Sequence, residues 1–253
     1  MLNSLTINKE VFINMYDFDI IIVGAGPAGI FTALETTKIN PEKKILIIDS
    51  GSTIDNRKCP ARKTGKCVNC NPCNIMNGWA GAGAFSDGKL SLCDEVGGNI
   101  TDYISHEETS KLIEYADNTY LSFGAPDKVF GRNNKFANDL SYLAHKENIK
   151  LIPCPVRHMG TEYSFEVLRN MYKELCKSKN FKFLEHTTAL SILVENNKVE
   201  GVYVETKGKG KVLFRAPYVV AAPGRGGSNW LTKVAAENGI KTSNKEVDIG
   251  VRV

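Results

Sequence analysis

The sequence of 253 residues lacks the marks of several large protein classes. No apolar run approaches the roughly 20 residues that a membrane span requires, and the stretch around Glu10 lacks the basic end and apolar core of a signal peptide. The excess of positive charge is small, because 32 Lys and Arg residues stand against 28 Asp and Glu residues. A formal net charge of +4 gives little support to nucleic-acid binding. We therefore expect a cytoplasmic protein that does not enter membranes, and the charge gives little reason to expect nucleic acid as a partner.

The motifs of several enzyme classes are missing as well. The sequence holds no Walker loop, no nucleophile–base pair and no pair of catalytic carboxylates. Hydrolase and kinase functions are thus without positive support. Internal repeats and low-complexity tracts are also absent, whereas hydrophobic side chains make up 42% of the chain. That share suffices for a sizeable core in one or two domains.

One β-α-β unit is predicted near the N-terminus. After a leader over residues 1–16, the apolar run at 19–23 is typical of a strand buried on both faces. A glycine turn at 24–29, with the sequence Gly-Ala-Gly-Pro-Ala-Gly, opens a helical apolar pattern that Pro41 ends. A second buried strand is predicted over 44–49. Two such strands joined by a helix indicate a parallel sheet.

The residue types of this unit suit a dinucleotide. Gly24 permits the tight turn, Gly26 lets backbone amides approach a pyrophosphate, and Gly29 lets the helix pack closely on the strand. The helix N-terminus then faces the anion with unpaired amides. Asp49 ends the second strand, where a carboxylate accepts hydrogen bonds from an adenosine ribose. The cofactor-binding residues predicted in this unit are Gly24, Gly26, Pro27, Ala28, Gly29, Asp49 and Ser50.

A run of strands between about residues 188 and 220 indicates which dinucleotide is bound. Turns at 195–198 and 207–210 divide this run, so that 190–206 reads as strand, turn and strand, and 211–221 as a third strand. The third strand leads into Ala222-Pro223-Gly224. This pattern resembles the β-meander and following strand of the glutathione-reductase-like flavoproteins with two dinucleotide-binding domains, although Pro223 replaces the usual Thr. The resemblance implies FAD rather than NAD.

The glycine-rich segment at 76–90 narrows the resemblance. Together with the cysteine-rich stretch before it, this segment resembles a bacterial family of FAD-dependent dehydrogenases, and the similarity extends over most of 17–253. Consecutive small residues let a backbone lie against a planar ring, and their amides can bond the flavin. Lys89 would place a cation near that ring, which favours an anionic reduced flavin. Further predicted cofactor-binding residues are Gly81, Gly83, Ala84, Ser86, Asp87, Gly88, Ala222 and Gly224.

Four cysteines fall within 15 residues and form the predicted metal-ligating set. These are Cys59, Cys67, Cys70 and Cys73. Reduced thiols in such a run favour an iron–sulfur cluster or a structural zinc ion. A redox-active dithiol beside the flavin and an exposed loop of free thiols are the two alternatives. The cysteines at positions 93, 154 and 176 are isolated in the sequence and are interpreted as packing residues.

The fold class predicted from these segments is α/β. A Rossmann-like FAD-binding domain is expected over 17–96 and 183–242, with an inserted α+β segment over 97–182 that contains helices near 110–121, 133–147 and 164–177. In the superfamily that the sequence resembles, such an insertion forms part of a substrate cap. His158, in a loop before the last of these helices, is a candidate proton donor.

Two functions follow from this sequence, and they differ in class. The first is an FAD-dependent oxidoreductase that passes hydride or electrons through the flavin, with Lys89 and His158 as candidate catalytic residues. The second is a non-catalytic module that holds only the ADP moiety. A flavoprotein acting on tRNA is a distant third. Because residues 243–253 read as the start of a second cap segment, we expect an N-terminal portion, and neither the small-molecule substrate nor the electron donor is identified.

Overall fold

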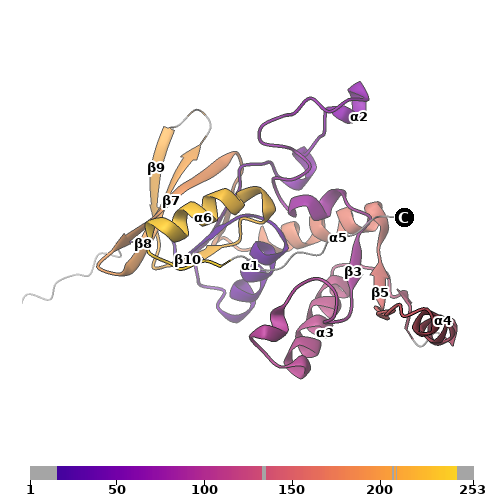
Figure 1. Ribbon diagram of the computed structural model, residues 1–253. Coiled ribbons are helices and arrows are strands. Elements are labelled where there is room, and N and C mark those ends of the chain that lie inside the picture. Colours follow the sequence, from indigo (N-terminus) through magenta and orange to yellow (C-terminus); the bar gives the residue numbers. More distant parts are fainter. Residues whose placement is uncertain (1–15, 133–134, 207, 209, 244–253) are drawn as a thin grey trace, which may run out of the picture.

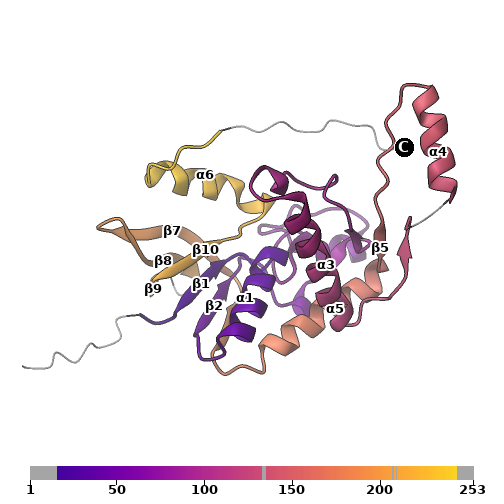
Figure 2. The ribbon, with the colours of Figure 1, turned by 90° about the horizontal axis from the view of Figure 1, so that it is seen from below.

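The computed structural model describes residues 16–132, 135–206, 208 and 210–243. The predicted leader, except for its last residue, and the predicted second cap segment, except for its first residue, therefore lie outside the described residues. In Figures 1 and 2 the chain forms a layered body, from which helix α4 (Lys135–Lys146) projects. No helix in the described ranges combines the length and the apolar character needed to cross a lipid bilayer.

A parallel sheet of four strands lies at the centre of the body. Its strands are β1 (Ile20–Val23), β2 (Ile45–Ile48), β6 (Phe181–Leu184) and β10 (Tyr218–Ala221), in the order β10-β1-β2-β6. All three pairings are parallel. Both inner strands are almost wholly buried, as the uninterrupted apolar runs predict for a sheet covered on both faces.

Different layers cover the two faces of this sheet. Helices α1 (Pro27–Ile39) and α5 (Gly160–Leu175) pack on the face that carries Ile22 and Ile47. The other face, with Ile21 and Leu46, packs on an antiparallel sheet made of β7 (Thr187–Glu195), β8 (Lys198–Thr206) and β9 (Gly210–Arg215). This arrangement confirms the predicted α/β fold with a parallel sheet and a β-meander (Figure 1).

The third strand predicted at 211–221 is in fact two strands. β9 ends at Arg215 in the meander, whereas β10 begins at Tyr218 in the parallel sheet. Pro217 lies between them and has no N–H to donate to a ladder, so the chain changes sheets at that point.

Helix α5 and strand β6 belong to the layers of the central sheet, although most of their residues lie in the predicted insertion. Trp79 is fully buried under α5, and its Nε1 donates to the Leu168 carbonyl at 2.9 Å. The Trp79 ring also meets the rings of Phe181 and Phe183 edge-on, with centroids 6.4 and 5.6 Å away. The glycine-rich segment is thereby anchored between α5 and the sheet.

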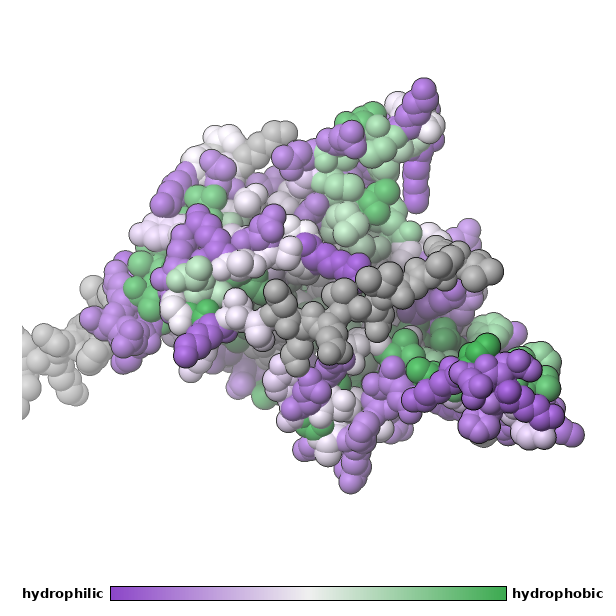
Figure 3. All heavy atoms as spheres, viewed as in Figure 1, coloured by the Kyte–Doolittle hydropathy of each residue, from purple (hydrophilic) through white to green (hydrophobic). Residues whose placement is uncertain are grey.

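A second, smaller antiparallel sheet stands beside the body. It consists of β3 (Lys89–Ser91), β5 (Val156–His158) and β4 (Val129–Phe130), in the order β3-β5-β4. The helices around it are α3 (His106–Ser122), which starts at a capping box formed by Ser105 and Glu108, and α4. No described residue of α4 is buried, and Figure 3 shows green apolar spheres among purple polar ones in this region.

The remaining elements are short or terminal. Helix α6 (Ser228–Glu237) follows β10, and α2 (Ala61–Thr64) lies in the cysteine-rich stretch. Single 3₁₀ turns are found at Ile54–Asn56, Gly81–Phe85, Ile100–Asp102 and Arg225–Gly227.

Candidate cofactor site

The glycine turn between β1 and α1 is built from close backbone approaches. Gly24 has a φ of +104°, and a Cβ atom there would lie 2.2 Å from the Ala222 carbonyl oxygen. A Cβ atom on Gly29 would lie 2.1 Å from the carbonyl oxygen of Gly24. Both positions therefore require glycine, as predicted. Gly24 permits the tight turn, and Gly29 lets α1 approach β1.

Gly26 differs from these two glycines because nothing fills the space beside it. A Cβ atom on Gly26 would meet no other part of the described chain within 4 Å. No side chain caps the N-terminus of α1, and Pro27 stands in its first turn. The first-turn amides and the positive end of the helix dipole thus face open space, which is the arrangement that binds a phosphate group.

Asp49, at the end of β2, ties three loops together. Its Oδ2 accepts a hydrogen bond from the Ala25 amide at 2.9 Å, and its Oδ1 accepts from the Gly51 and Gly78 amides at 2.8 and 2.7 Å. A carboxylate offers about four acceptor positions. Three are used by the backbone, which leaves room for roughly one bond to a ribose hydroxyl.

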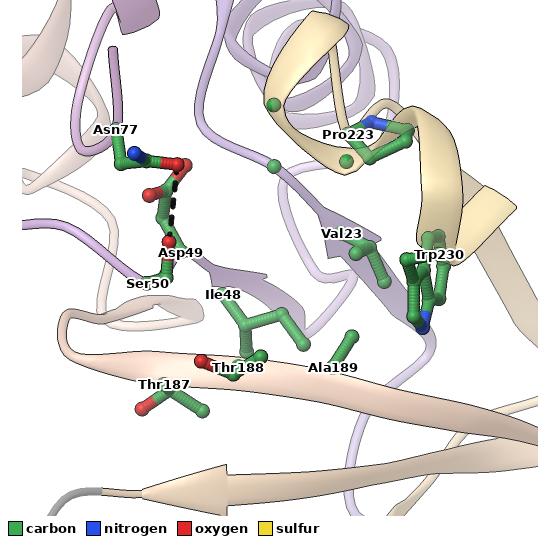
Figure 4. Close-up of a pocket in the computed structure, with 13 residues that line it drawn as sticks. Val23, Ile48, Asp49, Ser50, Asn77, Thr187, Thr188, Ala189, Pro223 and Trp230 are labelled. Atoms are coloured by element: carbon green, nitrogen blue, oxygen red, sulfur yellow. Dashed lines mark hydrogen bonds between the residues drawn. The ribbon is translucent and has the colours of Figure 1, made fainter. Parts of the chain in front are cut away.

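A pocket opens beside Asp49 between the glycine turn, the start of β7 and the start of α6. Figure 4 shows Asp49 and Asn77 on one side and Pro223 and Trp230 on the other, with a hydrogen bond of 3.3 Å between Ser50 Oγ and Asn77 Oδ1. Trp230 Nε1 is buried and has no acceptor among the described residues. The lining is Val23, Gly24, Ile48, Asp49, Ser50, Asn77, Thr187, Thr188, Ala189, Pro223, Gly226, Gly227 and Trp230.

This pocket contains only part of the predicted cofactor-binding set. Gly24, Asp49 and Ser50 line it, and Ala222 donates its amide to the Val23 carbonyl at 2.8 Å just behind it. Sequence reasoning missed Asn77, Thr188 and Trp230. The strand ending at Gly224 pointed to this edge of the sheet, but no local pattern showed that α6 would turn back over it.

The glycine-rich segment adjoins the glycine turn directly. The Ala80 amide donates to the Ala25 carbonyl at 2.7 Å, and a Cβ atom on Gly81 would lie 3.5 Å from Gly26 Cα. Gly83 has open space beside it, whereas Gly88, with a φ of +64°, packs against Ser164. The Ser86 Oγ accepts a hydrogen bond from the Gly88 amide at 3.1 Å. Residues 80–83 therefore extend the surface that begins at Gly26.

A buried arginine fixes this segment, and no sequence motif indicated its role. Arg57 is 5% exposed, and its guanidinium donates to the carbonyls of Asn74, Ile75, Trp79 and Gly81 at 2.5–3.1 Å. Burial lowers the pKa of Arg57 to about 10, against the opposing effect of the Asp49 charge. Arg57 stays protonated at neutral pH and acts as a positioning residue for the glycine-rich segment.

Lys89 and His158, the two predicted catalytic residues, lie opposite each other on β3 and β5. His158 is on a strand rather than in the predicted loop, because α5 begins at Gly160 instead of near residue 164. Lys89 forms an ion pair of 2.9 Å with Asp87, and more than half of each side chain is exposed. Neither Lys89 nor His158 lines the pocket at Asp49.

The structure does not gather the four cysteines of the predicted metal set. No group of three or more His, Cys, Asp or Glu side chains in the described ranges is placed to hold a metal ion. Cys70 and Cys73 are in contact, and the amides of Ile75 and Met76 hold the pKa of Cys73 below its usual value. As arranged, the described residues do not fit a metal centre.

The glycine turn, the uncapped helix and the acid at the end of β2 define a Rossmann-type dinucleotide-binding domain. Residues 144–245 match a protein family described as "FAD binding domain". This match bears out FAD as the predicted cofactor and agrees with the resemblance to FAD-dependent flavoproteins.

Individual relatives are similar over part of their length. An uncharacterized protein of Clostridium beijerinckii is 40% identical over 72 residues, which are 28% of this chain and 13% of that protein. The 3-ketosteroid-Δ4-(5α)-dehydrogenase of Rhodococcus jostii RHA1 superposes with a TM-score of 0.50 at 15% identity, over 84% of this chain and 47% of the dehydrogenase. The E. coli quinol fumarate reductase superposes with a TM-score of 0.46 at 18% identity, over 81% of this chain and 32% of the reductase. The chain spans less than half of either solved protein.

Proposed function

We propose that this chain is the FAD-binding part of an oxidoreductase that transfers hydride or electrons between a small molecule and the flavin. The observation that carries the proposal is the continuous surface from Gly26 to Gly83. It joins an open helix N-terminus to a small-residue segment held by Arg57. A module for ADP alone would need the first part of this surface but not the second.

Different residues of the chain would bind different parts of the cofactor. The first-turn amides of α1 would bind the pyrophosphate, and Asp49 and the pocket beside it would bind the adenosine. Trp230 Nε1 is a donor in that pocket that lacks an acceptor in the described chain. When bound, the flavin supplies the site that accepts and releases hydride or electrons.

Lys89 and His158 are proposed to act beside the flavin. Their side chains share one face of the small sheet, because directly opposed residues in an antiparallel pair point to the same side. His158 is also edge-on to Phe130, with ring centroids 6.3 Å apart. On this arrangement, Lys89 would hold a cation near the reduced ring, and His158 would donate a proton to the substrate. The substrate and the electron donor are small molecules of unidentified class.

A spectroelectrochemical titration of the FAD-loaded chain tests this function against the ADP-only module. If the glycine-rich segment contacts the flavin ring, the midpoint potential of bound FAD differs from that of free FAD, and FAD binds more tightly than ADP. Lys89→Met should lower the potential, because it removes the cation that stabilises the anionic reduced flavin, whereas Lys63→Met, a matched change in α2, should leave the potential unchanged. Equal affinities for FAD and ADP, with an unshifted potential, would overturn the oxidoreductase and leave the ADP module.

We also propose a reducing compartment such as the cytoplasm. The support is that all seven cysteines, each within the described ranges, are free thiols.

A further inference from the structure

Two cysteines that are far apart in the sequence lie side by side in the small sheet. The Sγ atoms of Cys93 and Cys154 are 2.9 Å apart, although the residues are 61 positions apart. This contact corrects the interpretation of both as isolated packing residues. We propose that Cys93 and Cys154 are a redox modification site, in which a peroxide converts the two thiols reversibly into a disulfide.

The register of the β3–β5 pair explains why these cysteines meet. Lys89 faces His158 and Ser91 faces Val156, so the same register places Cys93 opposite Cys154 just beyond the strand ends. The Leu92 amide donates to the Pro155 carbonyl at 2.8 Å, which shows that the pairing continues past Ser91. The backbone pairing thus places the two cysteine side chains opposite each other.

The same register gives the pair a geometry that suits a disulfide. Hydrogen-bonded and non-hydrogen-bonded pairs alternate along an antiparallel ladder. Because Leu92 and Pro155 form a hydrogen-bonded pair, Cys93 and Cys154 form a non-hydrogen-bonded one. Cα atoms in such pairs are about 4.5 Å apart, within the range of about 4.4–6.8 Å that disulfides span. The sulfur atoms need to approach by less than about 1 Å to reach the S–S bond length.

The surroundings of the two cysteines favour the reduced thiols in the absence of an oxidant and leave them accessible to a small oxidant. Burial, together with the neighbouring Cys154 thiol, raises the pKa of Cys93, so this thiol stays protonated at neutral pH. Both cysteines are half-buried. Cys93 and Asp94 line an open cavity of about 390 Å³ next to α3, which gives a small oxidant a route to Cys93.

The chemistry balances with hydrogen peroxide as the oxidant. One thiol loses its proton, and its sulfur attacks a peroxide oxygen; the O–O bond breaks, the departing hydroxide takes up that proton, and a sulfenic acid and one water form. The second thiol sulfur then attacks the sulfenic sulfur and displaces a second water. Two thiols and one peroxide therefore give one disulfide and two waters. A dithiol reductant reverses the step by thiol–disulfide exchange.

The bond would lock the strand pair that carries Lys89 and His158. It would close a loop of 61 residues that contains α3, β4 and α4. Closing a loop of this length restricts the unfolded chain more than the folded one. Oxidation should therefore stabilise the small sheet and hold Lys89 opposite His158.

Peptide mapping of the peroxide-treated chain tests the proposal. The reduced chain is treated with hydrogen peroxide, remaining thiols are blocked with N-ethylmaleimide, and the digest is analysed by mass spectrometry without reductant. We expect a dominant Cys93–Cys154 peptide that dithiothreitol removes. We also expect the midpoint of thermal unfolding to rise on the order of 10 °C after oxidation.

Variants separate this pair from the other five cysteines. Cys93→Ser and Cys154→Ser should each abolish both the linked peptide and the thermal shift, whereas Cys176→Ser, at an exposed position, should keep both. The peptide map of the wild-type chain gives its answer whether or not these variants fold. The proposal fails if Cys93 and Cys154 are recovered unlinked after oxidation, if either is linked mainly to another cysteine, or if both end as sulfinic acids.

Discussion

Replacing Gly26 with alanine is expected to leave the fold intact and to weaken FAD binding. The added Cβ would meet no described atom of the chain within 4 Å, and the φ of −74° at this position is ordinary for an alanine. The change in folding free energy should therefore stay within about 0.5 kcal/mol. The methyl group would nevertheless occupy the space through which a pyrophosphate approaches the first-turn amides of α1.

Gly29→Ala is the matched comparison, because its effect should fall on stability first. Its Cβ would lie 2.1 Å from the Gly24 carbonyl oxygen and 3.2 Å from Ile22 Cγ2, so α1 must move away from β1. Overpacking of this kind costs about 1–3 kcal/mol, which corresponds to a fall of roughly 2–12 °C in the unfolding midpoint. For Gly26→Ala we expect an unchanged midpoint and an FAD affinity at least about tenfold lower, or about 1.4 kcal/mol.

Two assays on the same samples measure both quantities. Thermal unfolding of the flavin-free chain reports stability, and isothermal titration with FAD reports affinity. The reasoning about the turn would be refuted if Gly26→Ala bound FAD like the wild type. It would also be refuted if Gly26→Ala destabilised the flavin-free chain as much as Gly29→Ala does.

Three further substitutions test the charged side chains that hold the glycine-rich segment, the small sheet and the glycine turn. Arg57→Lys should lower the free energy of unfolding by roughly 2–4 kcal/mol in urea titrations, since one ammonium replaces a guanidinium that serves four carbonyls; an unchanged midpoint would contradict this. Asp117→Asn should lower the free energy of unfolding by about 3–5 kcal/mol, because it leaves Arg157 buried without its charged partner. Asp139→Asn in α4 is the control. Asp49→Asn should reduce FAD affinity about tenfold, because its amide nitrogen would face the Ala25 N–H; equal affinity would show that the carboxylate does not organise the turn.

Those parts of the fold that depend on neighbouring residues could be predicted from the sequence. The buried runs at 19–23 and 44–49 became β1 and β2, and the glycine spacing gave the turn and helix between them. Periodicity and glycine chemistry are local signals, so they survive without knowledge of the tertiary structure. The roles of Gly24 and Gly29 were predictable for the same reason.

The contacts that could not be predicted from the sequence join residues that are far apart along the chain. Lys89 faces His158, and Cys93 faces Cys154, only because β3 and β5 pair across some 60 intervening residues. Arg57 looked like one cation among many until its four carbonyl partners were in place. A surface pattern does not distinguish a solvated arginine from one buried under its own loop.

Identification of the flavin retained by the purified chain is the most direct test of FAD binding. The chain is isolated, denatured to release bound cofactor, and the released nucleotide is separated and quantified by liquid chromatography. We predict FAD at close to one equivalent for each chain, restored to the same level when the flavin-free chain is supplied with FAD. Retention of FMN, or failure to bind FAD after reconstitution of a folded chain, would contradict the account.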